Sequence, residues 1–184
     1  MNITKIERIE QFKGIMRNGI PGWFMEDVTK KIDDLGFFEA PASVSHHGNY
    51  SGGLFDHSFC VTNALVDLTK KLDLKWKRER SPYIVGMFHD LCKCDNYKRM
   101  PKGADPEHWE YNNASILPGH GEKSVIMLLP IINLTDEEIA CIRWHMGAFD
   151  DKSLWNNYGQ AVTQFPNVLF THTADMIAAR IYRI

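Results

Sequence analysis

Apolar residues recur with the spacing of α-helices along most of the chain, and no alternating pattern typical of a β-strand extends beyond a few residues. Near the start, the ranges Ile3 to Met16 and Trp23 to Leu35 are predicted as helices, separated by the helix-breaking segment Asn18 to Gly22. From Phe37 to Gly53 the pattern fails, and glycine, serine and proline predict a long loop. The pattern therefore predicts an all-α protein.

Signals at helix ends help to place the later helices. Ser81 and Pro82 are typical of a helix start, with serine as the N-cap and proline in the first turn. Thr135 and Glu138 have the spacing of a capping box. The predicted helices run from near Asp56 to Leu72, from Ser81 to Asp90, from Glu122 to Leu129, from Thr135 to His145 and from Pro166 to Tyr182. Residues 98–118 and 147–160 are predicted as loops or irregular insertions.

The length of 184 residues fits one domain with a small appendage. We expect residues 1–40 to be an N-terminal helical extension packed on the core, and residues 41–184 to form the main domain. Hydrophobic residues at 44% and charged residues at 24% are ordinary for a soluble globular protein. The net charge of −2 argues against a dedicated surface for duplex nucleic acid, but it permits a small basic pocket.

The cysteines and the apolar runs bear on the cellular compartment. No signal peptide is expected at Met1 to Glu10, and no apolar run approaches the roughly 20 residues of a membrane span. A reduced, cytoplasmic setting is the simplest inference. Cys92 and Cys94 are close in sequence, but Cys60 and Cys141 stand alone, so free thiols are favoured over a structural zinc site.

Histidines and aspartates are distributed so that nearly every predicted helix contributes one. They are His57, the pair His89 and Asp90, His120, His145 and Asp175. Each interval corresponds to about one helix and its connection, so antiparallel helices would bring these side chains to the same level of a bundle. Imidazole and carboxylate groups together suit Mn, Fe, Co, Ni or Zn better than Mg or Ca.

The order His57, His89-Asp90, Asp175 resembles the H…HD…D signature of HD-domain phosphohydrolases. The additional His120 and His145 resemble the variants of this family that hold two metal ions. The resemblance covers about residues 41–180 and implies an HD-domain helical bundle with a buried metal site.

Two shorter stretches extend the resemblance. Residues 41–47 and 52–57 are similar to the opening segment of the HD domains of a bacterial 3′–5′ exoribonuclease and of certain conjugative relaxases. Residues 89–93 resemble the HDxGK form of the motif, in which the lysine is thought to contact the scissile phosphate. Cys92 stands where glycine is usual in that motif.

The resemblance implies a metal-dependent phosphohydrolase, either a phosphomonoesterase or a phosphodiesterase, that uses two divalent ions. In these roles, His57, His89, Asp90 and Asp175 bind one ion, and Asp90 bridges to a second ion held by His120 and His145. A metal-bound hydroxide would attack the phosphorus in line, with Asp90 and Lys93 as the catalytic residues. Lys93 would stabilise the charge that develops on the phosphate oxygens.

Other residues are weaker predictions. Tyr97, Lys98, Arg99 and Trp144, with Lys93, are predicted to bind substrate, although such residues are as readily explained by a solvated loop or by core packing. His47 and His172 are predicted to support the metal ligands from outside rather than to bind metal.

The expected substrate is a phosphoester of a nucleotide or short oligonucleotide, because the chain has neither an OB-like β-domain nor a basic stripe for long nucleic acid. One alternative is a non-catalytic HD module that binds a nucleotide or a protein partner. Others are a one-metal enzyme, with His120 and His145 contacting substrate, and a di-iron oxygenase built on the same ligands. The oligomeric state is left open.

Overall fold

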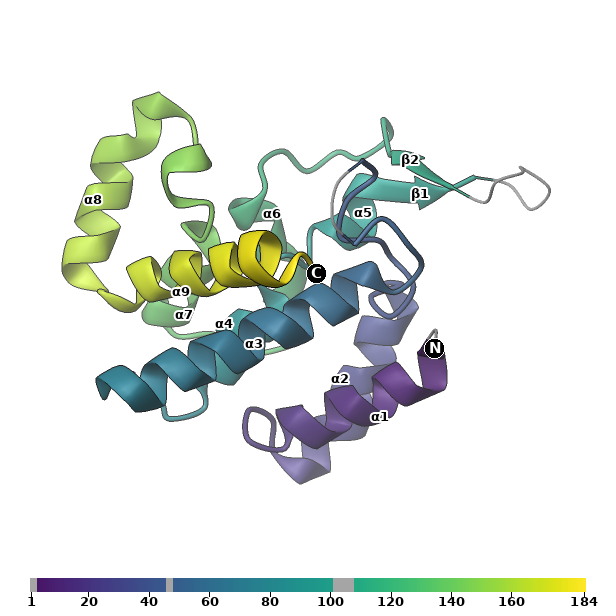
Figure 1. Cartoon of the computed structure of the whole chain (residues 1–184), viewed down its shortest axis with the longest axis horizontal. Helices are drawn as coiled ribbons and strands as arrows, with labels where there is room; N and C mark the ends of the chain where they lie inside the picture. The colour runs from purple at the N-terminus through teal and green to yellow at the C-terminus, as the bar shows by residue number, and fades with distance from the viewer. Residues whose placement is uncertain (1–2, 46–47, 101–107) are drawn as a thin grey trace.

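The computed structural model describes residues 3–45, 48–100 and 108–184, and this part of the chain is mostly helical (Figure 1). The α-helices are α1 Lys5–Met16, α2 Gly22–Asp34, α3 Gly53–Leu72, α4 Ser81–Phe88, α5 Lys93–Asn96, α6 Gly121–Leu128, α7 Asp136–Arg143, α8 Trp155–Gln164 and α9 Asn167–Met176. A π-helix, η3 Ile177–Tyr182, continues α9. Short 3₁₀ turns occupy Gly147–Phe149 and Lys152–Leu154. The predicted all-α class is confirmed.

The core lies where α3, α4 and α9 pack together, and in Figure 1 α9 runs beside α3. A cluster of buried phenylalanines extends this core toward the N-terminal helices. Phe12 of α1 has its ring centre 5.5 Å from that of Phe38 and 6.1 Å from that of Phe88. The first helix therefore shares the core of the later ones. The predicted boundary between residues 40 and 41 stays a prediction.

Local signals located some helix ends correctly. At α7 the capping box is confirmed, because Glu138 N donates to Thr135 Oγ1 at 3.2 Å and Thr135 N donates to Glu138 Oε2 at 2.7 Å. The prediction of Ser81 as an N-cap was wrong, since Ser81 is the first residue of α4 and follows the cap. Its buried hydroxyl instead donates to Glu138 Oε1 at 2.7 Å.

Two segments predicted as loops contain regular structure. An antiparallel pair of strands, β1 Tyr97–Arg99 and β2 Trp109–Tyr111, lies within the first of them. Strands of three residues are too short to produce a clear alternating pattern. The helix α8 lies mostly within the second. None of its residues is fully buried, although Tyr158, Ala161 and Val162 pack partly buried against the core at helical spacing.

Two glycines allow the close helix contacts that shape the site. A Cβ atom on Gly86 of α4 would lie 2.6 Å from the Cα atom of Thr62 in α3. A Cβ atom on Gly121 would overlap the backbone of Arg143 at the end of α7. Because neither glycine has a side chain, α3 packs directly on α4, and the start of α6 packs directly on the end of α7.

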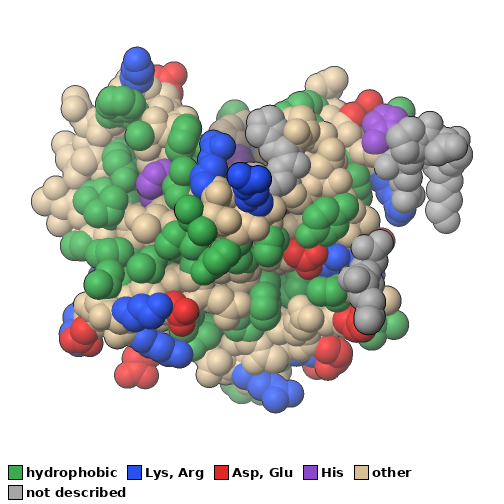
Figure 2. Space-filling view, in the orientation of Figure 1, with side chains coloured by type: hydrophobic (Ala, Val, Ile, Leu, Met, Phe, Trp, Pro, Cys, Tyr) green, Lys and Arg blue, Asp and Glu red, His purple; other side chains and the backbone are tan. Residues whose placement is uncertain are grey.

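Three further features concern the surface charges, the thiols and the length of the helices. On the face seen in Figure 2, Lys and Arg side chains form separate groups rather than a continuous band. Cys60, Cys92, Cys94 and Cys141 are all free. Among the described residues, no helix is both long and apolar enough to cross a membrane.

Candidate metal centre

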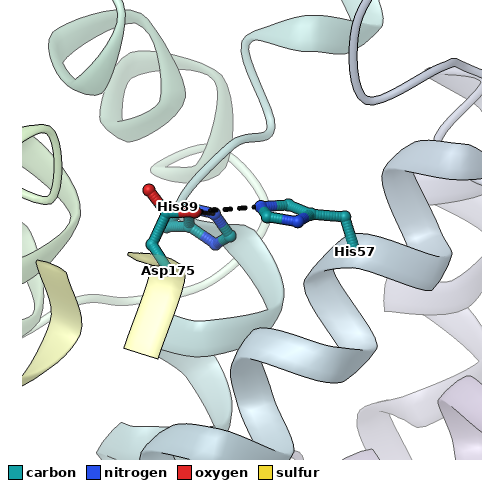
Figure 3. Close-up of side chains that lie close together, drawn as sticks. All are labelled: His57, His89 and Asp175. Carbon is teal, nitrogen blue, oxygen red and sulfur yellow. Dashed lines mark ion pairs between the residues drawn. The ribbon is translucent and has the colours of Figure 1, made fainter. Parts of the chain in front are cut away.

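The six histidines and aspartates predicted as ligands meet in one place. His57 projects from α3, His89 and Asp90 follow α4, His120 is the N-cap of α6, His145 lies two residues after α7, and Asp175 belongs to α9. The side chains of His57, His89, Asp90 and His145 are almost completely buried. Figure 3 shows the ring of His57 pointing from α3 toward Asp175 and His89. Elements that are distant in sequence therefore deliver nitrogen and oxygen donors to one buried centre.

One group of donors surrounds Asp175. Its Oδ1 atom lies 3.1 Å from Nε2 of His57 and 3.9 Å from Nε2 of His89. The same two ring nitrogens lie 3.6 Å and 3.4 Å from Oδ2 of Asp90. The donor atoms of His57, His89 and Asp175 are close enough to hold one metal ion.

A second group lies on the other side of Asp90. Its Oδ1 atom is 2.6 Å from Nε2 of His120 and 3.3 Å from Nε2 of His145. The two oxygens of one carboxylate therefore face two different sets of histidines. This is the arrangement that a carboxylate shared between two metal ions requires.

Backbone carbonyls fix the tautomer of three of these histidines. The Nδ1 atoms of His57, His89 and His145 lie 2.8, 2.9 and 2.7 Å from the backbone oxygens of Ile184, Gly86 and Ile142, respectively. A carbonyl oxygen only accepts hydrogen bonds, so each Nδ1 carries a proton. In the neutral ring, Nε2 then directs a lone pair toward the carboxylates, as a metal ligand must.

Two of these Nε2 atoms lack a hydrogen-bond partner among the described residues. Those of His89 and His145 are buried and make no hydrogen bond with any described residue. Burial also lowers the pKa of His145, which keeps that ring neutral at pH 7. Because buried polar atoms are normally paired, a ligand such as a transition-metal ion fits this position.

Both carboxylates of the centre are ionised at neutral pH. Burial favours the neutral form of Asp90, but the ammonium of Lys93 and the rings of His89 and His120 outweigh it and hold the pKa well below the usual value. Burial acts in the same direction on Asp175, where the neighbouring rings of His57 and His89 outweigh it and lower the pKa. The centre therefore presents two anionic oxygen donors.

Two cations adjoin Asp90. The ammonium of Lys93 lies 2.6 Å from Oδ2 of Asp90. Burial would lower the pKa of Lys93, but Asp90 outweighs it, and the pKa is raised. Burial also opposes the charged form of His120, yet Asp90 raises the pKa of that ring to about 10. Positive charge in this position suits a site that receives an anion.

A cavity of about 210 Å³ opens onto the centre. It is lined by His57, Asp90, Lys93, His120, Met146, Phe149, Asp175, Met176, Ala179 and Arg180. Cavities of 510 and 520 Å³ elsewhere, near α1 and the start of α3, contain none of the histidines of the centre. Since pockets for whole small molecules usually occupy about 300–1,000 Å³, the smaller cavity fits part of a ligand, such as a phosphate group.

The other predicted site residues lie elsewhere. In the described part of the chain, the lining of this cavity includes Lys93 but not Tyr97, Lys98, Arg99 or Trp144. Lys98 pairs with Glu110 of the neighbouring strand at 2.9 Å, and the guanidinium of Arg143 lies 3.9 Å from the ring centre of Trp144. Nδ1 of His172 lies 2.8 Å from the backbone oxygen of His145, and its supporting role stays a prediction. His47 lies outside the described residues.

Sequence reasoning missed two residues at the centre. Arg180 lines the cavity five residues after Asp175, an interval that places two residues on different faces of an α-helix. In the π-helix that follows α9, the hydrogen-bond step of five residues brings them toward one face. Cys92 is the other, with Sγ 3.5 Å from Nδ1 of His120. The one sequence signal for Cys92 is that cysteine stands where the HDxGK motif usually has glycine.

The fold and this centre define an all-α protein with a buried histidine–aspartate cluster suited to divalent metal ions. No family model matches the chain, and no solved structure matches it. Over 78 residues the chain is 33% identical to the dihydroneopterin 2′,3′-cyclic phosphate phosphodiesterase of Methanocaldococcus jannaschii. The aligned part is 41% of this chain and 31% of the archaeal protein, so the chain matches about a third of that relative's length.

Proposed function

We propose that the chain is a metal-dependent phosphohydrolase of the HD superfamily that cleaves a phosphoester bond in a nucleotide or short oligonucleotide. The observation behind this proposal is the position of Asp90, whose two oxygens face two sets of histidine nitrogens. The partial similarity to a phosphodiesterase supports the same class of reaction.

The donor set suggests how the ions would be held. His57, His89, Asp90 and Asp175 would bind one ion, while Asp90, His120 and His145 would bind the second. Two divalent ions in such a site lower the pKa of a coordinated water and neutralise phosphate oxygens. The mixture of imidazole and carboxylate favours Mn, Fe, Co, Ni or Zn.

The cations of the cavity would hold the phosphate. The ammonium of Lys93 has three N–H donors, and one of them suffices for its contact with Asp90. The remaining donors can reach a phosphate oxygen in the cavity that Lys93 lines, and they would stabilise negative charge developing there. Arg180 lines the same cavity and would supply a second, forked contact to the phosphate.

The size of the cavity suggests how much of the substrate it encloses. A volume of about 210 Å³ suits the phosphate and its nearest atoms, which leaves the base outside. The relative is named for a 2′,3′-cyclic phosphate, so a cyclic phosphodiester is the first substrate class to test. Tyr97, Lys98, Arg99 and Trp144 would contact only those parts of a substrate that extend beyond the cavity.

Hydrolysis of a defined phosphoester panel tests the proposal. The panel contains 2′,3′-cyclic nucleotides, nucleoside monophosphates, a short oligoribonucleotide and bis(p-nitrophenyl) phosphate. Each is assayed with Mn²⁺, Fe²⁺, Co²⁺, Ni²⁺ or Zn²⁺. We expect turnover of at least one phosphoester by the wild-type chain and none by Asp90→Asn. A fully metal-loaded protein without turnover of any substrate would contradict the proposal and favour the non-catalytic binding module.

A further inference from the structure

His120 differs from the other histidines of the centre in the atom that meets its Nδ1. Backbone oxygens meet the Nδ1 atoms of His57, His89 and His145, whereas the Sγ atom of Cys92 lies 3.5 Å from Nδ1 of His120. We propose that the thiol of Cys92 positions His120 as a ligand of the second metal ion. This inference rests on the metal centre of the proposed function.

The chain holds Cys92 and His120 in a fixed relation. The backbone N–H of Cys92 donates to Oγ of Ser124 at 3.0 Å. The backbone N–H of Ser124 in turn donates to the backbone oxygen of His120 at 3.1 Å. Cys92 is fully buried, and Ser124 is fully buried as well. The thiol is therefore a built-in neighbour of the imidazole, held through Ser124 of α6.

The side of the ring that the sulfur meets indicates its role. Sγ lies next to Nδ1, while the opposite nitrogen, Nε2, is 2.6 Å from Oδ1 of Asp90. The carboxylate of Asp90 only accepts, so Nε2 is the donor of that contact, and Nδ1 is left to meet the sulfur, which is a weak donor and a weak acceptor. A metal ion that displaces the Nε2 proton now directed at Asp90 would meet the Nε2 lone pair, while Nδ1–H would stay directed at the sulfur. A contact of this kind, from outside the ligand set, typically changes metal affinity by about 10- to 100-fold.

Metal titration of cysteine variants tests the inference without relying on turnover. The wild-type chain, Cys92→Ala, Cys92→Ser and Cys94→Ala are stripped with a chelator and titrated with Co²⁺ by calorimetry and visible absorption. We expect Cys92→Ala to bind the second ion about 10- to 100-fold more weakly, with the first ion unaffected. The hydroxyl of Cys92→Ser can accept the same hydrogen bond and should restore most of the affinity. Cys94→Ala, which changes a less buried thiol two residues away, should match the wild type.

Several outcomes would overturn the inference. The first is a folded Cys92→Ala variant that binds both ions with wild-type affinity. The second is a thiolate-to-cobalt absorption band that is present in the wild type and lost in Cys92→Ser, because it would make the sulfur a direct ligand. The third is a wild-type chain that takes up no second ion. If the wild type binds two ions but hydrolyses no phosphoester, the proposed function fails while the titration still decides the role of Cys92.

Discussion

At the scale of single residues, Asp90 is the side chain that faces both groups of histidines in the centre. It is nearly inaccessible, yet it contacts Lys93 and His120 at 2.6 Å through different oxygens. A buried carboxylate is costly unless it is paired, so these contacts explain how an ionised aspartate persists inside a helical protein. Bound metal ions would serve the same purpose.

Lys93→Ala should slow hydrolysis without lowering the metal content of the protein. The variant removes a cation that lines the cavity but no proposed metal ligand. Loss of one group that stabilises transition-state charge typically lowers kcat about 100- to 1,000-fold. Steady-state kinetics and elemental analysis on the same samples would measure both properties. Lys30→Ala, which removes an exposed lysine paired with Asp34 in α2, is the control and should keep wild-type rates. Unchanged kcat in Lys93→Ala would exclude its proposed role.

Arg180→Ala should weaken substrate binding more than it slows the chemical step. The guanidinium lines the cavity from the π-helix, where it can hold a phosphate oxygen in the ground state as well as in the transition state. Such uniform binding appears in KM rather than in kcat, and a charged hydrogen bond accounts for a change of roughly tenfold. The measurement is KM with the best substrate of the panel. A KM equal to that of the wild type would contradict the proposed contact between Arg180 and the phosphate.

The six clustered residues could be predicted from the sequence because their chemistry is distinctive and their spacing follows the helices. Their roles as metal ligands are still a prediction. Arg180 could not be predicted, because its position depends on a local change from α- to π-helix that no motif marks. Tyr97, Lys98 and Arg99 are near Lys93 in sequence, but they form a short strand, and none of them is among the residues that line the cavity.

At the scale of elements, the centre depends on how closely the helices approach one another. Gly86 of α4 lies three residues before His89, and it faces Thr62 in α3, the helix that also contains His57. The contact between the two helices therefore sets the separation of two proposed ligands of one ion. The contact of Gly121 with the backbone of Arg143 does the same for His120 and His145.

Gly86→Ala should destabilise the fold and reduce metal uptake together. The new methyl group would meet the backbone of Thr62, and forcing a methyl group into a packed contact costs typically about 1–3 kcal/mol. Urea unfolding of the metal-free protein measures the loss, and metal titration measures the site. Gly14→Ala is the matched control, because a Cβ atom there meets nothing within 4 Å; it should stabilise α1 by about 0.5–1 kcal/mol. Equal effects of the two variants would contradict this account.

The elements that the sequence predicted well have strong local signals. The capping box at Thr135 is one of them, because both of its hydrogen bonds join residues three positions apart. The helix α8 was missed although Tyr158, Ala161 and Val162 have helical spacing, because the polar residues and the glycine among them are also typical of a loop. Close helix contacts at Gly86 and Gly121 depend on tertiary packing, which periodicity does not specify.

At the scale of the whole molecule, a buried lysine links the α5 region to α6. The ammonium of Lys123, which is fully buried, lies 2.6 Å from Oδ2 of Asp95 and 2.7 Å from Oδ1 of Asn96. The hydrogen bonds from Lys123 and Ser115 lower the pKa of Asp95. This network holds the last two residues of α5, the short helix that begins with Lys93.

Acid should therefore weaken the fold partly through Asp95. Since the folded pKa of Asp95 is lowered, its stabilising contribution is present above the unfolded value near about 3.9 and is lost as the pH falls through the folded value. Urea unfolding of the metal-free protein between pH 6 and pH 3 should show a wild-type advantage over Asp95→Asn that shrinks below about pH 4. Stability curves that stay parallel over this range would contradict the contribution of Asp95.

The most direct test of the central claim is the metal content of the purified chain. Wild-type protein and Asp90→Ala are stripped, reloaded with Mn²⁺ or Zn²⁺, freed of excess ions and measured by elemental analysis, with circular dichroism as the check on folding. We predict close to two ions per wild-type chain, and clearly fewer in an Asp90→Ala variant that keeps its helical spectrum. A wild-type chain that retains no ion, or a variant that retains as many as the wild type, would contradict the account.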